Sequence, residues 1–259
     1  MSNIHKLPII GKFIKTLDRD IKKYGWQDAA RRIIKYTNTS LEIIGKYPKL
    51  DIILAEKGVI IVANHPFEAE TIALIASLPT RKDTYLMVNA MFTGLGNSID
   101  KHLIPVYIRH HKNPKIKKRL LKKIMDTFHP QKEYSPDIEH KKNIININKA
   151  SQIVRKGGLV IIYPGRRSTD GKWFDGVGYF IKGVGKSKNT YIVQVYSEGT
   201  SNWDYLRLHP LLGKILPKVK IYFSRELPIN KFISENAKEI KNKLEDNYCK
   251  WLSTIGKNN

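Results

Sequence analysis

Short runs of β-branched and other apolar residues recur along the chain and alternate with segments of helical periodicity. Such runs are typical of strands that are buried on both faces of a sheet. They predict strands at Ile52–Leu54, Val59–Val62, Tyr85–Val88, Leu103–Arg109, Leu159–Tyr163, Thr190–Tyr196 and Val219–Phe223. Because strands and helices alternate, the pattern predicts an α/β fold with a mixed, largely parallel sheet flanked by helices.

Apolar residues spaced three and four positions apart predict the helices. The expected helices are residues 9–24, Gln27–Ile44, Thr71–Leu78, Pro114–Phe128, Asn148–Lys156 and Asn236–Ile255. Met91–Leu95 is expected to be a short apolar helix or loop. Gln131–Lys142 is polar and contains a proline, so it is expected to be a surface loop.

The first two predicted helices form an amphipathic helical hairpin, residues 1–48, ahead of an α/β domain at residues 49–259. Lysines and arginines lie between the apolar positions of both helices. A basic amphipathic hairpin can lie in a membrane interface. The same pattern also fits an ordinary hairpin that packs on the domain, and the sequence leaves both interpretations open.

The length and composition limit the class of protein. With 259 residues and 41% hydrophobic residues, the chain is long and apolar enough for a well-packed core. Its single cysteine, Cys249, excludes an internal disulfide and a cysteine-based metal cluster. No apolar run approaches the roughly 20 residues of a membrane span, and the first residues lack the apolar core of a signal peptide. The expected location is cytoplasmic, peripheral on a membrane surface.

The net charge of +23 predicts attraction to polyanions. Candidate partners are nucleic acid, anionic lipid and phosphorylated or CoA-type substrates, although a surplus of solubilising lysine would give the same charge. The sequence shows neither the aromatic pattern of an RNA-recognition module nor zinc-finger spacing, so no specific nucleic acid is expected. The basic segment 109–123 fits either a solvated face or a contact with anionic lipid or donor phosphate.

One histidine follows the predicted strand Val59–Val62 directly, and an acid stands five residues later. His65 can accept a proton near neutral pH, and Glu70 on its other ring nitrogen would fix the tautomer and stabilise the imidazolium. No Ser, Cys or Lys nucleophile adjoins the pair in sequence, which favours direct activation of a substrate hydroxyl. The alternatives are a histidine at a helix start that binds a capping acid, and Glu68 as the partner in place of Glu70.

Arginines follow two other predicted strands. Arg109 ends one strand, and Arg166 and Arg167 lie in the glycine turn after Leu159–Tyr163. Guanidinium groups bind phosphate or carboxylate with two parallel hydrogen bonds, so these positions indicate anion sites at the carboxyl edge of a sheet. Solvated arginines at strand ends are the alternative. Gly183-Val184-Gly185-Lys186-Ser187 ends like a phosphate-binding loop but lacks its first glycine and a preceding strand, so we reject that function.

Four of these elements together resemble the motifs of the glycerolipid acyltransferase superfamily, which includes lysophosphatidic acid acyltransferase-like proteins. Asn64-His65, four residues and Glu70 resemble the first motif, in which the usual acid is Asp. The strand ending at Arg109 resembles the second motif, and Thr190–Tyr196 occupies the place of the fourth. Ile162-Tyr163-Pro164-Gly165-Arg166-Arg167-Ser168 resembles the third, Phe-Pro-Glu-Gly-Thr-Arg-Ser, without its Glu and one residue shorter.

The resemblance implies transfer of a fatty acyl group from acyl-CoA or acyl-carrier protein to the hydroxyl of a lysophospholipid or glycerol-phosphate-like acceptor. It implies that His65 is the general base and Glu70 its partner, without a metal or a cofactor other than the donor. The residues expected to bind substrate are Asn64, Glu68, Arg109, Arg166, Arg167 and Ser168. Peripheral contact with anionic membrane is expected.

Two other functions remain open at this stage. The Glu missing from the third motif leaves room for a different acceptor, such as an amine, a sugar or an amino-acid lipid. The charge alone would also suit a non-catalytic basic protein that binds lipid or nucleic acid.

Overall fold

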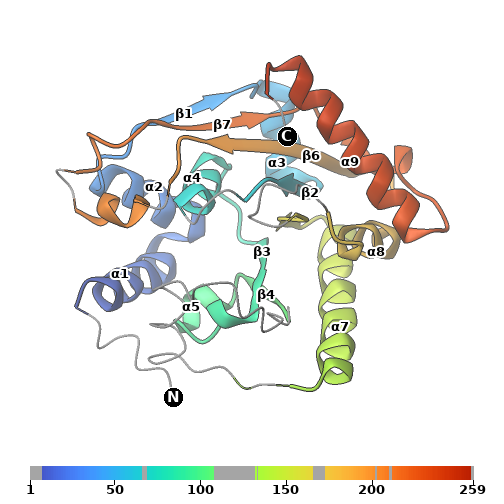
Figure 1. Cartoon of the computed structure of the whole chain (residues 1–259), viewed down its shortest axis with the longest axis horizontal. Helices are drawn as coiled ribbons and strands as arrows, with labels where there is room; N and C mark the ends of the chain where they lie inside the picture. Colours follow the sequence, from blue (N-terminus) through green and yellow to red (C-terminus); the bar gives the residue numbers. More distant parts are fainter. Residues whose placement is uncertain are drawn as a thin grey trace, which may run out of the picture.

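A computed structural model describes residues 8–65, 69–107, 132, 134–165, 173–201, 203–209 and 212–257. Within them, an eight-stranded sheet is covered by helices on both faces (Figure 1). The strands are β1 Leu41–Ile44, β2 Gly58–Ala63, β3 Thr84–Asn89, β4 Leu103–Val106, β5 Leu159–Ile162, β6 Thr190–Glu198, β7 Val219–Phe223 and β8 Leu227–Pro228.

The strand order is β1-β7-β6-β2-β5-β3-β4, and β8 pairs with β6. β6, β2, β5, β3 and β4 are parallel to one another, whereas β7 and β8 run antiparallel to β6. β1 is parallel to β7. The prediction of a mixed, largely parallel sheet is therefore confirmed. The five parallel strands place their carboxyl ends along one edge, where α/β sheets hold their sites.

Helices cover each face of the sheet. One face is covered by α1 Pro8–Tyr24, α2 Trp26–Tyr36, α3 Pro48–Glu56, α4 Ala69–Ser77 and the short α5 Asn97–Asp100. The other is covered by α7 Pro136–Arg155, α8 Gly176–Val184 and α9 Ala237–Thr254. None of the helices in the described part of the chain is both long enough and apolar enough to cross a bilayer.

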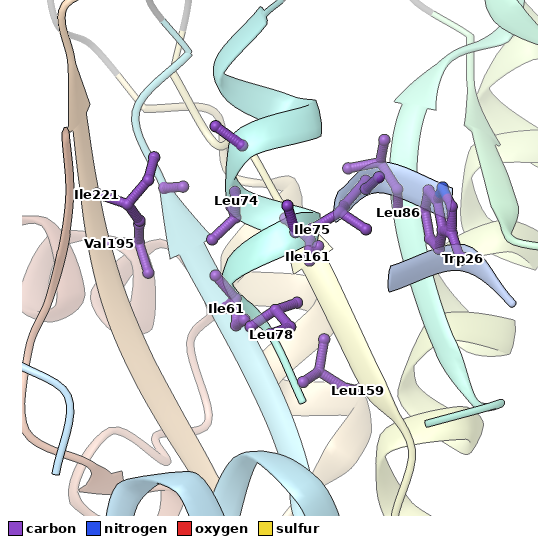
Figure 2. Packing of buried hydrophobic residues seen from close by; sticks show 14 of the residues in the cluster. Trp26, Ile61, Leu74, Ile75, Leu78, Leu86, Leu159, Ile161, Val195 and Ile221 are labelled. Atoms are coloured by element: carbon purple, nitrogen blue, oxygen red, sulfur yellow. The ribbon is translucent and has the colours of Figure 1, made fainter. Parts of the chain in front are cut away.

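The centre of the sheet is fully buried, as the β-branched runs predict. Val59 to Val62 of β2 have no exposed surface. Figure 2 shows Leu74 and Ile75 of α4 packed over Ile61 of β2 and Ile161 of β5. Because α4 is the next helix after β2, this packing fixes the two ends of the connection between them, and His65 lies at its start.

The predicted amphipathic helices at the N-terminus are present, but the second is shorter than expected. α2 ends at Tyr36, and Asn38 has a φ of 49°, a left-handed conformation that interrupts helical hydrogen bonding. The last four residues of the predicted helix form β1 at the edge of the sheet. The apolar positions of α1 and α2 belong to the same buried cluster as β2 and α4. The division of the chain at residue 48 stays a prediction.

Two other predicted elements are wrong. The strand expected at Ile52–Leu54 is the middle of α3, which begins with Pro48 in its first turn and buries Leu50, Ile53 and Leu54 on one side. The loop expected at Gln131–Lys142 contains the start of α7, which begins at Pro136 with acids in its first turn. The predicted helix Pro114–Phe128 lies outside the described residues.

Candidate active site

The site begins where β2 ends. After Ala63 the chain leaves the sheet through Asn64 and His65, and α4 starts at Ala69 with Glu70 in its first turn. His65 Nδ1 lies 2.5 Å from Glu70 Oε1. The Glu70 side chain is fully buried, whereas that of His65 keeps 30% of its surface exposed. A carboxylate on Nδ1 assigns the proton of the neutral ring to that nitrogen and leaves Nε2 as the proton acceptor.

Tyr163 lies against the face of the His65 ring. The two ring centroids are 4.6 Å apart, with 23° between the planes. Tyr163 directly follows β5, which pairs in parallel with β2, so both residues reach the same edge of the sheet. The Tyr163 hydroxyl forms a hydrogen bond of 3.0 Å with Thr71 Oγ1 of α4. Stacking therefore restricts rotation of the imidazole while Glu70 holds its Nδ1.

Burial raises the pKa of Tyr163, and the nearby charge of Glu70 raises it further, while the hydrogen bond with Thr71 acts in the opposite direction. The phenol therefore remains neutral throughout the physiological pH range. It contributes a ring surface and a hydrogen bond but no charge to the site.

Asn64 fixes the backbone next to His65. Its Nδ2 donates to the carbonyl of Ser197 at 2.9 Å, and its Oδ1 accepts from the Ser197 amide at 2.7 Å. Ser197 belongs to β6, on the side of β2 away from β5. Both ends of the Asn64 amide are thus used in holding β2 to β6. This geometry suits a residue that positions His65; the expected contact of Asn64 with substrate stays a prediction.

The remaining expected site residues are Glu68, Arg109, Arg166, Arg167 and Ser168, and all five lie outside the described residues. Their roles therefore stay predictions. The described chain reaches Gly165, which forms a bridge with Trp173, so both ends of the segment 166–172 start beside the end of β5. β4 ends at Val106, three positions before Arg109. In the described chain, no three His, Cys, Asp or Glu side chains gather as metal ligands would.

Sequence reasoning found the histidine and its acid but missed the contacts from other strands. Glu70 is bonded to His65 in the structure, whereas Glu68, the alternative partner, lies outside the described residues. Tyr163 occupies the place of the Phe in the third motif, and only its aromatic character was visible in the sequence. Ser197 contributes backbone groups, which leave no trace in a residue pattern.

Comparison with known proteins supports the fold. No protein-family model and no curated protein sequence matches the chain. Among solved structures, it is similar to the 1-acyl-sn-glycerophosphate (LPA) acyltransferase PlsC from Thermotoga maritima, with a TM-score of 0.52 and 15% sequence identity. The similarity covers 98% of this chain and 92% of the other. The protein therefore has an LPA acyltransferase-like fold.

Proposed function

We propose that the protein is an acyltransferase that uses His65 as its general base. The observation that carries the proposal is the hydrogen bond between His65 and the buried Glu70, at the carboxyl end of the central strand of this fold. A histidine held by a buried acid, with its second nitrogen available, is suited to take a proton from a hydroxyl group.

The reaction that fits this geometry is direct transfer from a thioester. Nε2 of His65 takes the proton of the acceptor hydroxyl, and the oxygen attacks the thioester carbonyl of acyl-CoA or acyl-carrier protein. The tetrahedral intermediate then collapses, the C–S bond breaks, and the leaving thiolate receives the proton from the imidazolium. Glu70 stabilises the imidazolium while it exists. Backbone amides of the turn at Asn64–Phe67 would stabilise the oxyanion.

The acceptor of this proposal is a lysophospholipid or a glycerol-phosphate-like molecule. Its phosphate would bind Arg166, Arg167 and Arg109, which follow strands whose carboxyl ends share the edge with β2. The segment that resembles the third motif lacks the Glu of the superfamily pattern. No residue is therefore assigned to the part of the acceptor that carries the hydroxyl. Product analysis is therefore built into the test.

The test compares the wild-type protein with His65→Ala and His140→Ala. His140 is an exposed histidine on α7, outside the site, and serves as the matched control. Thiol release from a panel of acyl-CoAs is measured with mixed lysolipid acceptors, and mass spectrometry identifies the acylated product. We expect His65→Ala to lose at least about 100-fold in rate while His140→Ala matches wild type. A folded His65→Ala variant with wild-type turnover would exclude His65 as the base, and DNA binding without thiol release would favour a non-catalytic function.

A further inference from the structure

The connection between β6 and β7 is folded around a buried cation. We call residues 199–218 the β6–β7 loop; residues 202, 210 and 211 lie outside the described part. Arg207 is only 4% exposed, and its Nε donates to Asp204 Oδ1 at 2.9 Å. Its NH2 group donates to the carbonyls of Gly199 and Pro217, at 3.1 and 2.7 Å. Arg207 therefore joins the two ends of the loop and fixes its shape from within.

The outer surface of the same loop is apolar and aromatic. Trp203, Tyr205 and Ile215 are 61%, 59% and 77% exposed, and the rings of Trp203 and Tyr205 lie 6.1 Å apart. An arginine inside and large apolar side chains outside is the reverse of the usual partition in water. Exposed apolar groups held on a rigid frame are typical of a surface that contacts another phase or molecule.

The loop lies against the carboxyl end of α2. A Cβ added to Gly213 would lie 1.6 Å from the Thr37 carbonyl oxygen, so only glycine permits this close approach. Figure 1 shows the β6–β7 loop, in orange, beside α2. The exposed Tyr36 at the end of α2 thereby adjoins the loop. The loop and the carboxyl end of α2, which are far apart in sequence, therefore lie together and both carry exposed aromatic residues.

The charges around this surface are positive. Lys214 and Lys218 are exposed on the loop, and Lys35 is exposed on α2, where the exposed Arg32 pairs with Asp20 of α1 at 3.5 Å. The one acid of the described loop, Asp204, is neutralised by Arg207. Lys218 pairs with Glu42 at 3.2 Å across a solvent-exposed contact, which water and salt weaken. Tryptophan and tyrosine among lysines is the composition that prefers the interface of an anionic bilayer.

The position of the loop relates it to the candidate active site. It begins at Gly199, two residues after Ser197, whose backbone holds Asn64 next to His65. A lipid surface in contact with the loop would therefore lie at the sheet edge that carries His65. We propose that the β6–β7 loop and the carboxyl end of α2 form a docking surface for an anionic lipid bilayer. The proposed function enters only as the reason why this edge should face a membrane, since its acceptor would be a lipid; the docking surface itself is argued from the loop.

The first test measures sedimentation of the full-length protein with vesicles. Wild type is expected to bind phosphatidylglycerol-rich vesicles and to bind pure phosphatidylcholine vesicles at least about tenfold less. Tyr205→Ser should weaken binding several-fold, and Trp203→Ser with Tyr205→Ser about tenfold or more. The matched control is Tyr179→Ser on α8, since Tyr179 is 58% exposed, almost the same as Tyr205. Equal binding by the loop variants and wild type would overturn the proposal.

A second measurement does not depend on the stability of the double variant. Vesicles of brominated lipid should quench part of the tryptophan fluorescence of wild type, and Trp203→Phe should remove that part while leaving binding intact. Unchanged quenching in Trp203→Phe would place another tryptophan at the lipid and overturn the proposal. A second result would also overturn the proposal. If wild type were an oligomer, and Trp203→Ser made it a monomer without changing vesicle binding, the loop would be a contact between copies of this chain.

Failure of the docking surface and failure of the proposed function give different results. If the function is correct and the loop docks on lipid, the double variant keeps thiol release with a short-chain, water-soluble acceptor and loses it with vesicle-borne acceptor. If wild type has no turnover with any acceptor but still shows loop-dependent vesicle binding, the proposed function fails and the docking surface stands.

Discussion

Replacing Glu70 with Gln tests the role of the buried acid with the smallest possible change. The substitution keeps the size of a side chain that has no exposed surface and removes only its negative charge. If Glu70 acts through His65, the effect should appear when the imidazolium forms, because a general base carries no positive charge until it takes the proton. Glu70 is then a positioning residue that also stabilises the charged form of its partner.

The distance between the two groups gives the expected magnitude. With His65 Nδ1 at 2.5 Å from Glu70 Oε1, the centres of the two charges lie about 4 Å apart, and at an effective dielectric constant of about 20 they attract by about 4 kcal/mol. The glutamine oxygen can still accept a hydrogen bond, which returns about 1 kcal/mol. The net loss of about 3 kcal/mol corresponds to a decrease in kcat of about 100-fold.

The assay is steady-state thiol release, with kcat and KM determined separately. We expect KM to change little, because the proposed contact of Glu70 is with His65 and not with the acceptor. Adding Glu70→Gln to His65→Ala should cause no further loss, since a partner cannot act through a base that is absent. Circular dichroism establishes that both variants are folded. A kcat within about threefold of wild type, or a further loss in the double variant, would refute this role of Glu70.

Three further predictions test packing at the site, in the core and at the opposite edge of the sheet. Tyr163→Phe keeps the ring on His65 but removes the hydroxyl, so urea unfolding should show a loss of about 1 kcal/mol with nearly unchanged kcat; Tyr163→Ala should also lower kcat. Leu74→Ala, in the core of Figure 2, should lower the free energy of unfolding by about 2–5 kcal/mol in the same experiment. Burial lowers the pKa of His102 below its usual 6.5, so the unfolded chain binds more protons just below that pH. Stability should therefore rise as pH increases toward about 6.5, and His102→Asn should reduce this slope in urea titrations between about pH 5 and pH 7.

Much of the sheet was predictable because its central strands are buried on both faces. Such strands need uninterrupted apolar, mostly β-branched residues, and this leaves a signal in the sequence at β2 and β5, whereas β7 alternates buried and half-buried residues. The same rule fails for α3, where a short apolar run suits a strand or a half-buried helix equally well. Pro48 was the better guide there, because proline suits the first turn of a helix.

The site was predictable only as far as its contacts are local. His65 and Glu70 are only five residues apart, and the end of β2 and the start of α4 bring them together. The contact between Asn64 and Ser197 spans 133 residues and depends on the strand order, which no periodicity reveals. Tyr163 reaches His65 for the same reason, through the pairing of β5 with β2. A sequence motif therefore identified the candidate base, while the sheet topology determines which residues hold it.

Three elements constrain His65 from different directions. Glu70 of α4 holds one ring nitrogen, Tyr163 after β5 covers one face of the ring, and Asn64 ties the adjacent backbone to β6. The freedom that remains is at Nε2 and the exposed part of the ring. If His65 is the general base, a ring held this firmly needs little reorganisation when it takes a proton, which is where preorganised sites gain rate. It follows that removal of the Tyr163 ring or changes to Asn64 should act on kcat through the position of His65, whereas changes to the arginines beyond β4 and β5 should act on KM for an anionic acceptor. The two groups of variants, measured with one acceptor, would separate the base from the anion site.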